Sequence, residues 1–118
     1  MLDVIREEKI SKTDLLNWIN NSTLHAHERE NRFAKINYDN MKIATTFLVD
    51  KNHKDGYELH IITWNAEIII VNYNTKRLIT VLFARPKQIT RYPIRNPQLA
   101  NRIIGIAITN ERTGKNNI

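Results

Sequence analysis

The residues of this sequence most able to do chemistry are a histidine and a carboxylate in one apolar run and three bases that follow another. His60 and Glu58 lie in the run YELHIIT, with one residue between them. Arg85, Lys87 and Arg91 come after the run RLITVLFA. Histidine and carboxylate groups transfer protons, and guanidinium groups stabilise charge that develops on a phosphate. Such residues suit metal-independent RNA cleavage, in which a base takes the proton of the 2′-hydroxyl and an acid protonates the leaving 5′-oxygen.

Each of these residues also has a plainer interpretation. His60 can be an ordinary histidine on the solvated edge of a sheet. The basic segment can be a surface turn that packs Ile89 and Tyr92 on the sheet, rather than a phosphate site in which Tyr92 stacks on a base. His25 and His27 lie in the stretch HAHERENR, which is typical of a solvated helix, so they are weaker candidates for acid or base. Both interpretations stay open at this point.

Several other chemistries find no support in the residues present. The chain has no cysteine, which excludes disulfides, thiolate zinc sites and cysteine nucleophiles. Its three glycines are isolated, so no glycine-rich phosphate loop is predicted. His25 and His27 would point about 200° apart on a helix, and we expect neither a metal nor another cofactor. Ser11 and Ser22 have the contexts of a helix cap and a turn rather than of a hydrolase nucleophile.

Positive charge is concentrated in the last third of the chain. The formal net charge of the 118 residues is +6. Residues 1–75 carry nine bases and eleven acids, whereas residues 76–118 carry nine bases and one acid. A one-sided basic surface attracts polyanions, so we expect RNA or DNA as a partner, although a merely solvated face has the same composition. The candidate nucleic-acid contacts are Lys76, Arg77, Arg85, Lys87, Arg91, Tyr92, Arg95 and Arg102.

The first half of the chain predicts helices. The segment SKTD at 11–14 resembles a capping box and precedes apolar residues, which indicates a helix that ends near Asn20. A second helix over 24–34 is polar on most faces and is expected at the surface. A third, over 39–51, is predicted because apolar side chains recur at helical spacing. Those side chains are Met41, Ala44, Phe47 and Leu48.

The second half of the chain predicts strands and a final helix. Residues 57–63, 66–73 and 77–84 are apolar runs between short turns, which predicts a three-stranded antiparallel meander. One helical turn is expected over 86–92. Asn96-Pro97 predicts the start of a helix that runs to about Ile106.

These elements predict one α+β domain over residues 1–118. N-terminal helices are expected to pack on a three- or four-stranded antiparallel meander that is followed by the C-terminal helix. Residues 1–10 and 110–118 are expected to be flexible.

Turn length decides which strand residues face the same way. If both turns of the meander have two central residues, His60 lies opposite Ile69, and Ile69 lies opposite Thr80. Glu58, His60 and Thr80 then share a mixed face on which chemistry is expected. The opposite face is the predicted core, with Leu59, Ile61, Ile68, Ile70, Ile79, Val81 and Phe83.

The stretch GYELHIITWNAEIIIVNYNTKRLITVLFARPKQITRY, preceded by helices, resembles the C-terminal meander of the small ribonucleases grouped with barnase, EndoU, colicin and RelE toxins. It is also similar to small phage-encoded proteins. The ribonuclease resemblance implies helices on one face of the sheet and catalytic residues on the other face and at the strand ends. The implied catalytic positions are His60, Thr80, Arg85 and Arg91, with His25 or His27 from a helix. Residues 93–118 depart from that pattern because they add a helix after the last strand.

The sequence therefore leads to two hypotheses for a small basic protein that acts on nucleic acid. In the first, the protein is a toxin-like, metal-independent ribonuclease. In the second, it is a non-catalytic accessory protein of a phage or mobile element that binds nucleic acid or inhibits a host nucleic-acid enzyme. An antitoxin or that host enzyme would be the protein partner. We expect a cytoplasmic location and no membrane association, because the longest apolar run, Ile68–Val71, is too short to span a bilayer.

Overall fold

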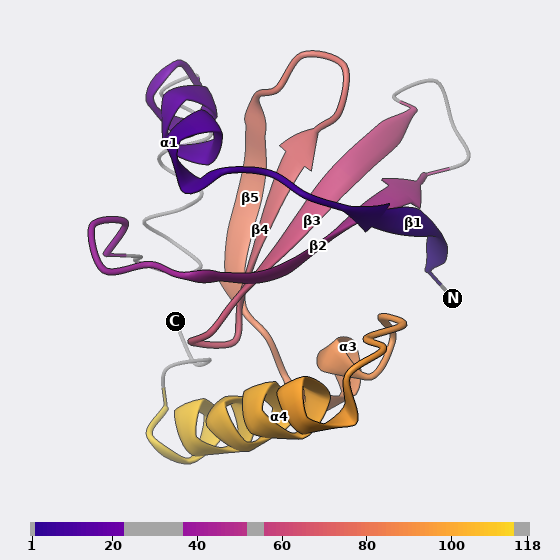
Figure 1. Ribbon diagram of the computed structural model, residues 1–118. Coiled ribbons are helices and arrows are strands. Elements are labelled where there is room, and N and C mark those ends of the chain that lie inside the picture. The colour runs from indigo at the N-terminus through magenta and orange to yellow at the C-terminus, as the bar shows by residue number, and fades with distance from the viewer. Residues whose placement is uncertain (1, 23–36, 52–55, 115–118) are drawn as a thin grey trace.

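The computed structural model describes residues 2–22, 37–51 and 56–114 (Figure 1). Within them, five strands form one antiparallel sheet in which every strand pairs with its neighbours along the chain. The α+β fold with an antiparallel sheet and a C-terminal helix, predicted from the sequence, is confirmed. The elements are β1 (Asp3–Glu8), α1 (Lys12–Asn20), β2 (Ile43–Asp50), β3 (Tyr57–Thr63), β4 (Glu67–Asn72), β5 (Leu78–Phe83), α3 (Pro86–Ile89) and α4 (Pro97–Arg112).

Two strands lie where the sequence predicted something else. The prediction of a helix over 39–51 is wrong, because Ile43–Asp50 forms β2 between β1 and β3. Its residues 45–49 are all buried, and burial on both faces removes the alternation by which a strand is recognised. The segment Asp3–Glu8, for which flexibility is expected from the sequence, is the edge strand β1.

Helices α1 and α4 begin where the capping residues in the sequence predict. α1 begins after Ser11, whose side chain accepts a hydrogen bond from the backbone N–H of Asp14. α4 begins after Asn96, whose side chain caps the first turn, and it continues to Arg112, beyond the predicted end. The helix predicted over 24–34 lies outside the described residues.

The register of the sheet differs from the expected one by one residue. His60 pairs with Ile70, and Ile70 pairs with Thr80. The turn between β3 and β4 is longer than predicted and places Ala66 in the left-handed region, at a φ of 61°. The pairing of β4 with β5 is also shifted by one residue, with an irregularity between Ile70 and Val71. Because both pairings are shifted, His60 and Thr80 still share a face, but the side chains of β4 point to the sides opposite to those predicted.

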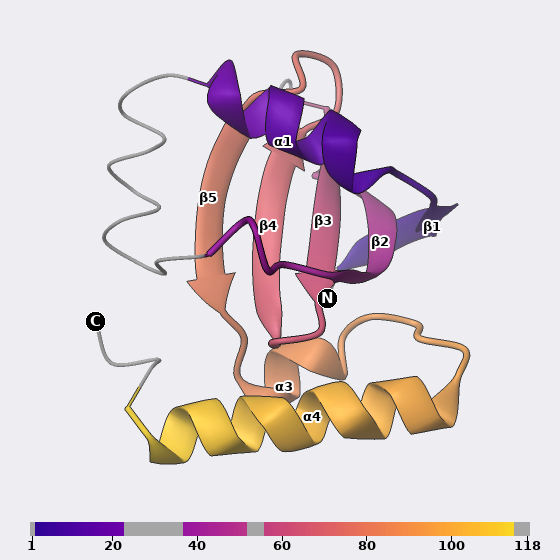
Figure 2. The same cartoon turned by 60° about the vertical axis from the view of Figure 1, so that its left-hand side comes forward.

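Each face of the sheet has its own apolar cluster. Leu15 and Ile19 of α1 are buried with side chains of one face. Ile103 and Ala107 of α4 are buried with side chains of the other face, together with Ile89 of α3. Figures 1 and 2 show α1 across one end of the strands β3 to β5, and α3 and α4 together at the other end. Among the described residues, no helix is long and apolar enough to cross a membrane.

Candidate functional site

His60 lies in a buried hydrogen-bond network and not on a solvated surface. Its side chain is on β3, and the residue is only 3% exposed. The ring nitrogen Nε2 lies 3.0 Å from Glu58 Oε1, and Nδ1 lies 2.6 Å from the hydroxyl of Tyr92. A carboxylate at Glu58 accepts from Nε2–H, so a neutral His60 uses Nδ1 to accept from the Tyr92 hydroxyl. Both ring nitrogens are thus engaged within the protein.

Tyr92 is the partner that closes this network. Its ring stacks on Phe47, with centroids 5.5 Å apart and an interplanar angle of 24°. Burial raises the pKa of the Tyr92 hydroxyl well above its usual range, although the neighbouring Arg91 charge works in the opposite direction. Tyr92 therefore stays protonated and donates to His60 at neutral pH. The ring face that packs on Phe47 is not available for the stacking on a base that the sequence suggested.

A small pocket, the His60 pocket, adjoins this network and is lined by Leu2 and by residues of the sheet, of α3 and of the segment after α3. Its volume is about 140 Å³. Its polar lining residues are His60, Gln88, Arg91 and Tyr92, and aliphatic side chains of the strands and of Leu2 form the rest. The aliphatic strand residues are Ile68, Ile70 and Leu82.

The structure brings together part of the predicted catalytic set. Glu58 contacts His60, and Arg91 borders the same pocket. Arg85 is exposed at the start of α3, where its backbone N–H donates to Gln88 Oε1 at 2.7 Å, and it does not line the pocket. Thr80 is on the same face as His60 but likewise does not line the pocket. His25 and His27 lie outside the described residues.

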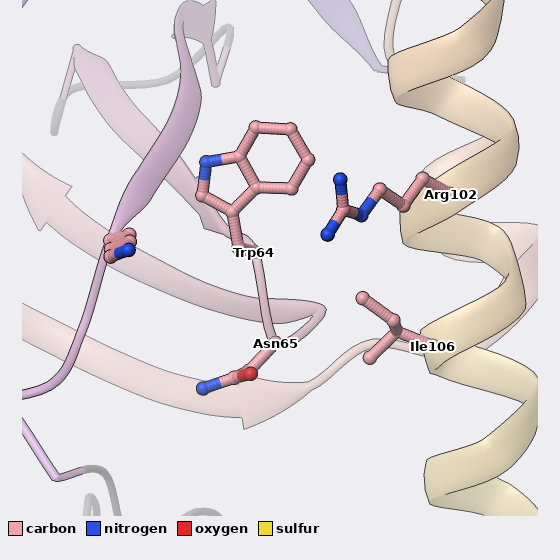
Figure 3. A pocket seen from close by; sticks show the side chains of 5 residues that line it. Trp64, Asn65, Arg102 and Ile106 are labelled. Atoms are coloured by element: carbon pink, nitrogen blue, oxygen red, sulfur yellow. The ribbon is translucent and has the colours of Figure 1, made fainter.

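A larger open groove lies between the β3–β4 turn and α4 (Figure 3). This Trp64 groove has a volume of about 510 Å³ and is lined by Lys42, Trp64, Asn65, Arg102 and Ile106. The guanidinium carbon of Arg102 lies 5.0 Å from the centre of the Trp64 ring. Figure 3 shows the guanidinium group facing the indole across the groove.

The groove is held in shape by contacts from both of its sides. The backbone N–H of Trp64 donates to the carbonyl of Lys42 at 3.0 Å. The side-chain amide of Asn110 donates to the carbonyl of Asn65 at 2.8 Å, and Asn110 is 4% exposed. Arg102 and Ile106 lie one helical turn apart on α4 and thus present to the same side. The turn that carries Trp64 is therefore fixed to the start of β2 at one side and to α4 at the other.

The basic residues named from the sequence fall into two groups. Lys76 is used internally, because its ammonium group donates to the carbonyl of Tyr73 at 2.6 Å and lies 3.8 Å from the centre of the Tyr73 ring. The remaining bases are exposed: Arg77, Arg85, Lys87, Arg91, Arg95 and Arg102.

Sequence reasoning missed Trp64, Lys42 and Gln88. Trp64 lies in a predicted turn between apolar strands, where a large aromatic side chain is unusual, and this was the available signal. Nothing local relates Lys42 or Gln88 to either site, because the fold alone brings them there.

Within residues 2–22, 37–51 and 56–114, no cluster of three or more histidine, cysteine or acidic side chains is arranged to hold a metal ion. Comparison of the chain with protein-family models, curated proteins and solved structures finds no match. The resemblance to small ribonucleases therefore stays a prediction.

Proposed function

We propose that the protein binds single-stranded nucleic acid through the Trp64 groove. The observation that supports this most directly is the half-buried Trp64 ring with the Arg102 guanidinium group over it, in an open groove that Lys42 also lines. Aromatic rings and guanidinium planes are the surfaces on which unpaired bases stack. The ammonium group of Lys42 is suited to contact the phosphate that follows a stacked base.

Stacking of this kind favours a single strand over a duplex. Bases in a duplex are stacked on their neighbours and present only their edges in the grooves. An unpaired base can add to the Trp64 and Arg102 pair without first being separated from a partner base. The other exposed bases of the last third, which include Arg91 and Arg95, add attraction for the rest of the strand without selecting its sequence.

Binding is better supported than cleavage. A general base must reach the proton that it removes, and both nitrogens of His60 are already hydrogen-bonded at a residue that is 3% exposed. The exposed guanidinium group of Arg85 does not line the pocket that His60 borders. The nucleic-acid part of the sequence hypothesis is therefore retained, and its ribonuclease part becomes an outcome to be tested.

The test is fluorescence anisotropy of labelled single-stranded RNA, single-stranded DNA and duplex, with the wild type and two groove variants. Trp64→Ala and Arg102→Gln are expected to weaken single-strand binding by about ten-fold or more, since one base stacked on an aromatic ring contributes about 1–3 kcal/mol. Arg112→Gln is the matched control, because Arg112 is exposed on the same helix but does not line the groove. Equal affinities for Trp64→Ala and the wild type would contradict the proposal.

The same samples decide between binding and cleavage. Single-stranded RNA of mixed length is incubated with the wild type in EDTA, beside a His60→Ala variant whose fold is confirmed by circular dichroism. We expect intact RNA in both samples. Cleavage that is absent from the variant would replace the proposal with the metal-independent ribonuclease. If the protein neither binds nor cleaves nucleic acid, that result would point to a protein partner, such as an antitoxin or a host nucleic-acid enzyme.

A further inference from the structure

The His60 pocket supports an inference that rests on the proposed function and extends it to base selection. We propose that this pocket takes one pyrimidine base of the bound strand. Its volume of about 140 Å³ is the first reason. A protein cavity of about 150 Å³ is filled by benzene, so the pocket has about the size of one six-membered ring and is smaller than the two fused rings of a purine.

The lining of the pocket has an apolar part, which suits the face of a base, and a polar part, which suits its edge. The aliphatic side chains of Ile68, Ile70 and Leu82 come from adjacent strands and offer an apolar surface for the face of the ring. Gln88 and Arg91 come from α3 and the segment after it, where the edge of the base would be. An apolar pocket with a few convergent polar groups is the usual form of a small-molecule site.

Two of the polar side chains, those of Gln88 and Arg91, offer donors to the pocket. Gln88 Oε1 already accepts from the backbone N–H of Arg85, which leaves the NH₂ group of Gln88 to donate. Arg91 is exposed and has only donors. The Tyr92 hydroxyl hydrogen is directed to His60, which leaves the Tyr92 oxygen only able to accept. The carbonyl oxygens of a pyrimidine base complement the donors of Gln88 and Arg91, and its N–H or NH₂ group complements the Tyr92 oxygen.

A second depression next to the pocket could hold the sugar and phosphate of the bound nucleotide. It has a volume of about 350 Å³, shares Leu2, Arg91 and Tyr92 with the His60 pocket and continues to Pro93. A sugar and phosphate attached to the buried base would follow this depression. Because Arg91 lines both depressions, its guanidinium group is suited to bind that phosphate in bidentate fashion.

The first test measures the affinity of oligouridine and oligoadenosine of equal length. The wild type is expected to prefer oligouridine by about ten-fold or more, the range over which a shaped apolar pocket discriminates. Leu82→Phe fills the pocket and is expected to bring this ratio close to one while the affinity for oligoadenosine stays within about two-fold. Ile10→Phe is the matched control, since Ile10 is partly buried against the cluster on the other face.

A second variant tests the donors without changing shape. Gln88→Glu keeps an oxygen that accepts from Arg85 N–H but replaces the NH₂ donor with a carboxylate oxygen. It is expected to lower the ratio of oligouridine to oligoadenosine affinity, whereas Gln98→Glu, at an exposed position on α4, is expected to leave the ratio unchanged. An unchanged ratio in both Leu82→Phe and Gln88→Glu would overturn the pyrimidine pocket.

A direct probe separates failure of this inference from failure of the proposed function. Uridine 5′-monophosphate and adenosine 5′-monophosphate are titrated into protein with labelled methyl groups. Only the uridine nucleotide is expected to shift the methyl signals of Ile68, Ile70 and Leu82. Absence of such shifts at millimolar nucleotide would overturn the pocket even if strands bind at the Trp64 groove. Shifts without any strand binding would instead contradict only the proposed function.

Discussion

At the scale of single residues, removal of the Tyr92 hydroxyl is expected to lower the free energy of unfolding. Tyr92→Phe keeps the ring on Phe47 but leaves Nδ1 of the buried His60 without its hydrogen-bond donor. A buried polar atom left without a partner costs about 1–3 kcal/mol of unfolding free energy. Urea unfolding should show that loss. Tyr57→Phe, at a residue that is 40% exposed, should cost much less, and an equal loss in both variants would contradict the role of this hydrogen bond.

The raised pKa of Tyr92 predicts a specific loss of stability in alkali. The unfolded chain releases this proton near the ordinary tyrosine pKa of about 10, whereas the folded protein keeps it. The contribution is therefore complete below about pH 10 and falls by about 1.4 kcal/mol for each further pH unit until the folded pKa is reached. Unfolding free energies measured from about pH 9 to about pH 11 should fall more steeply for the wild type than for Tyr92→Phe. Parallel curves would contradict this prediction.

The candidate site is only partly predictable from its residues. The sequence correctly places Glu58 and His60 together, because alternate residues of a strand share a face. The partner on the other nitrogen of His60 is not predictable, since Tyr92 lies 32 residues away and reaches His60 only after α3 folds against the sheet. Burial of His60 and Tyr92 favours a structural interpretation of the pair over a catalytic one, and that burial has no local signature in the sequence.

At the scale of elements, the contact between α4 and the β3–β4 turn holds the Trp64 groove open in one shape. Asn110→Ala removes the side-chain donor to the Asn65 carbonyl at a buried position. We expect a loss of about 1–3 kcal/mol in unfolding free energy, together with weaker single-strand binding. Asn101→Ala, at an exposed position of the same helix, is the control and should change neither quantity. Stability equal to that of the control would show that the contact does not fix the turn.

The elements also divide into those that local chemistry predicts and those that it does not. β3, β4 and β5 are predictable because apolar runs alternate with turn residues, and α4 because Asn96 and Pro97 mark its start. β2 has the pattern of a helix because it is buried on both faces, and only its place between two other strands decides its conformation. Two pairings are shifted by one residue from the expected register. One shift comes from Ala66 in the β3–β4 turn, since a left-handed alanine has no clear sequence signal, and the other accompanies an irregularity between Ile70 and Val71 in the pairing of β4 with β5.

At the scale of the whole molecule, the uneven charge predicts a salt dependence that belongs to one part of the chain. Removal of one phosphate-binding charge should reduce the slope of log affinity against log salt by about 0.7 for a single strand. Arg91→Gln and Arg95→Gln should each have this effect. Lys9→Gln removes an exposed charge from residues 1–75, where acids outnumber bases, and should leave the slope unchanged. Equal slopes in all three variants would contradict a binding surface in the last third.

The position of β1 has a consequence for exchange kinetics. β1 is an edge strand with an irregular register between Val4 and Arg6, and its partner strand does not begin until Ile43. A long connection and few buried side chains place such a strand among the first to open. Its amides should therefore exchange with deuterium faster than those of β3 and β4. Leu2, next to β1, is part of the His60 pocket wall, so a nucleotide bound in the pocket should slow the exchange of the β1 amides. The rate at which the nucleotide enters the pocket should then be limited by the rate at which β1 opens.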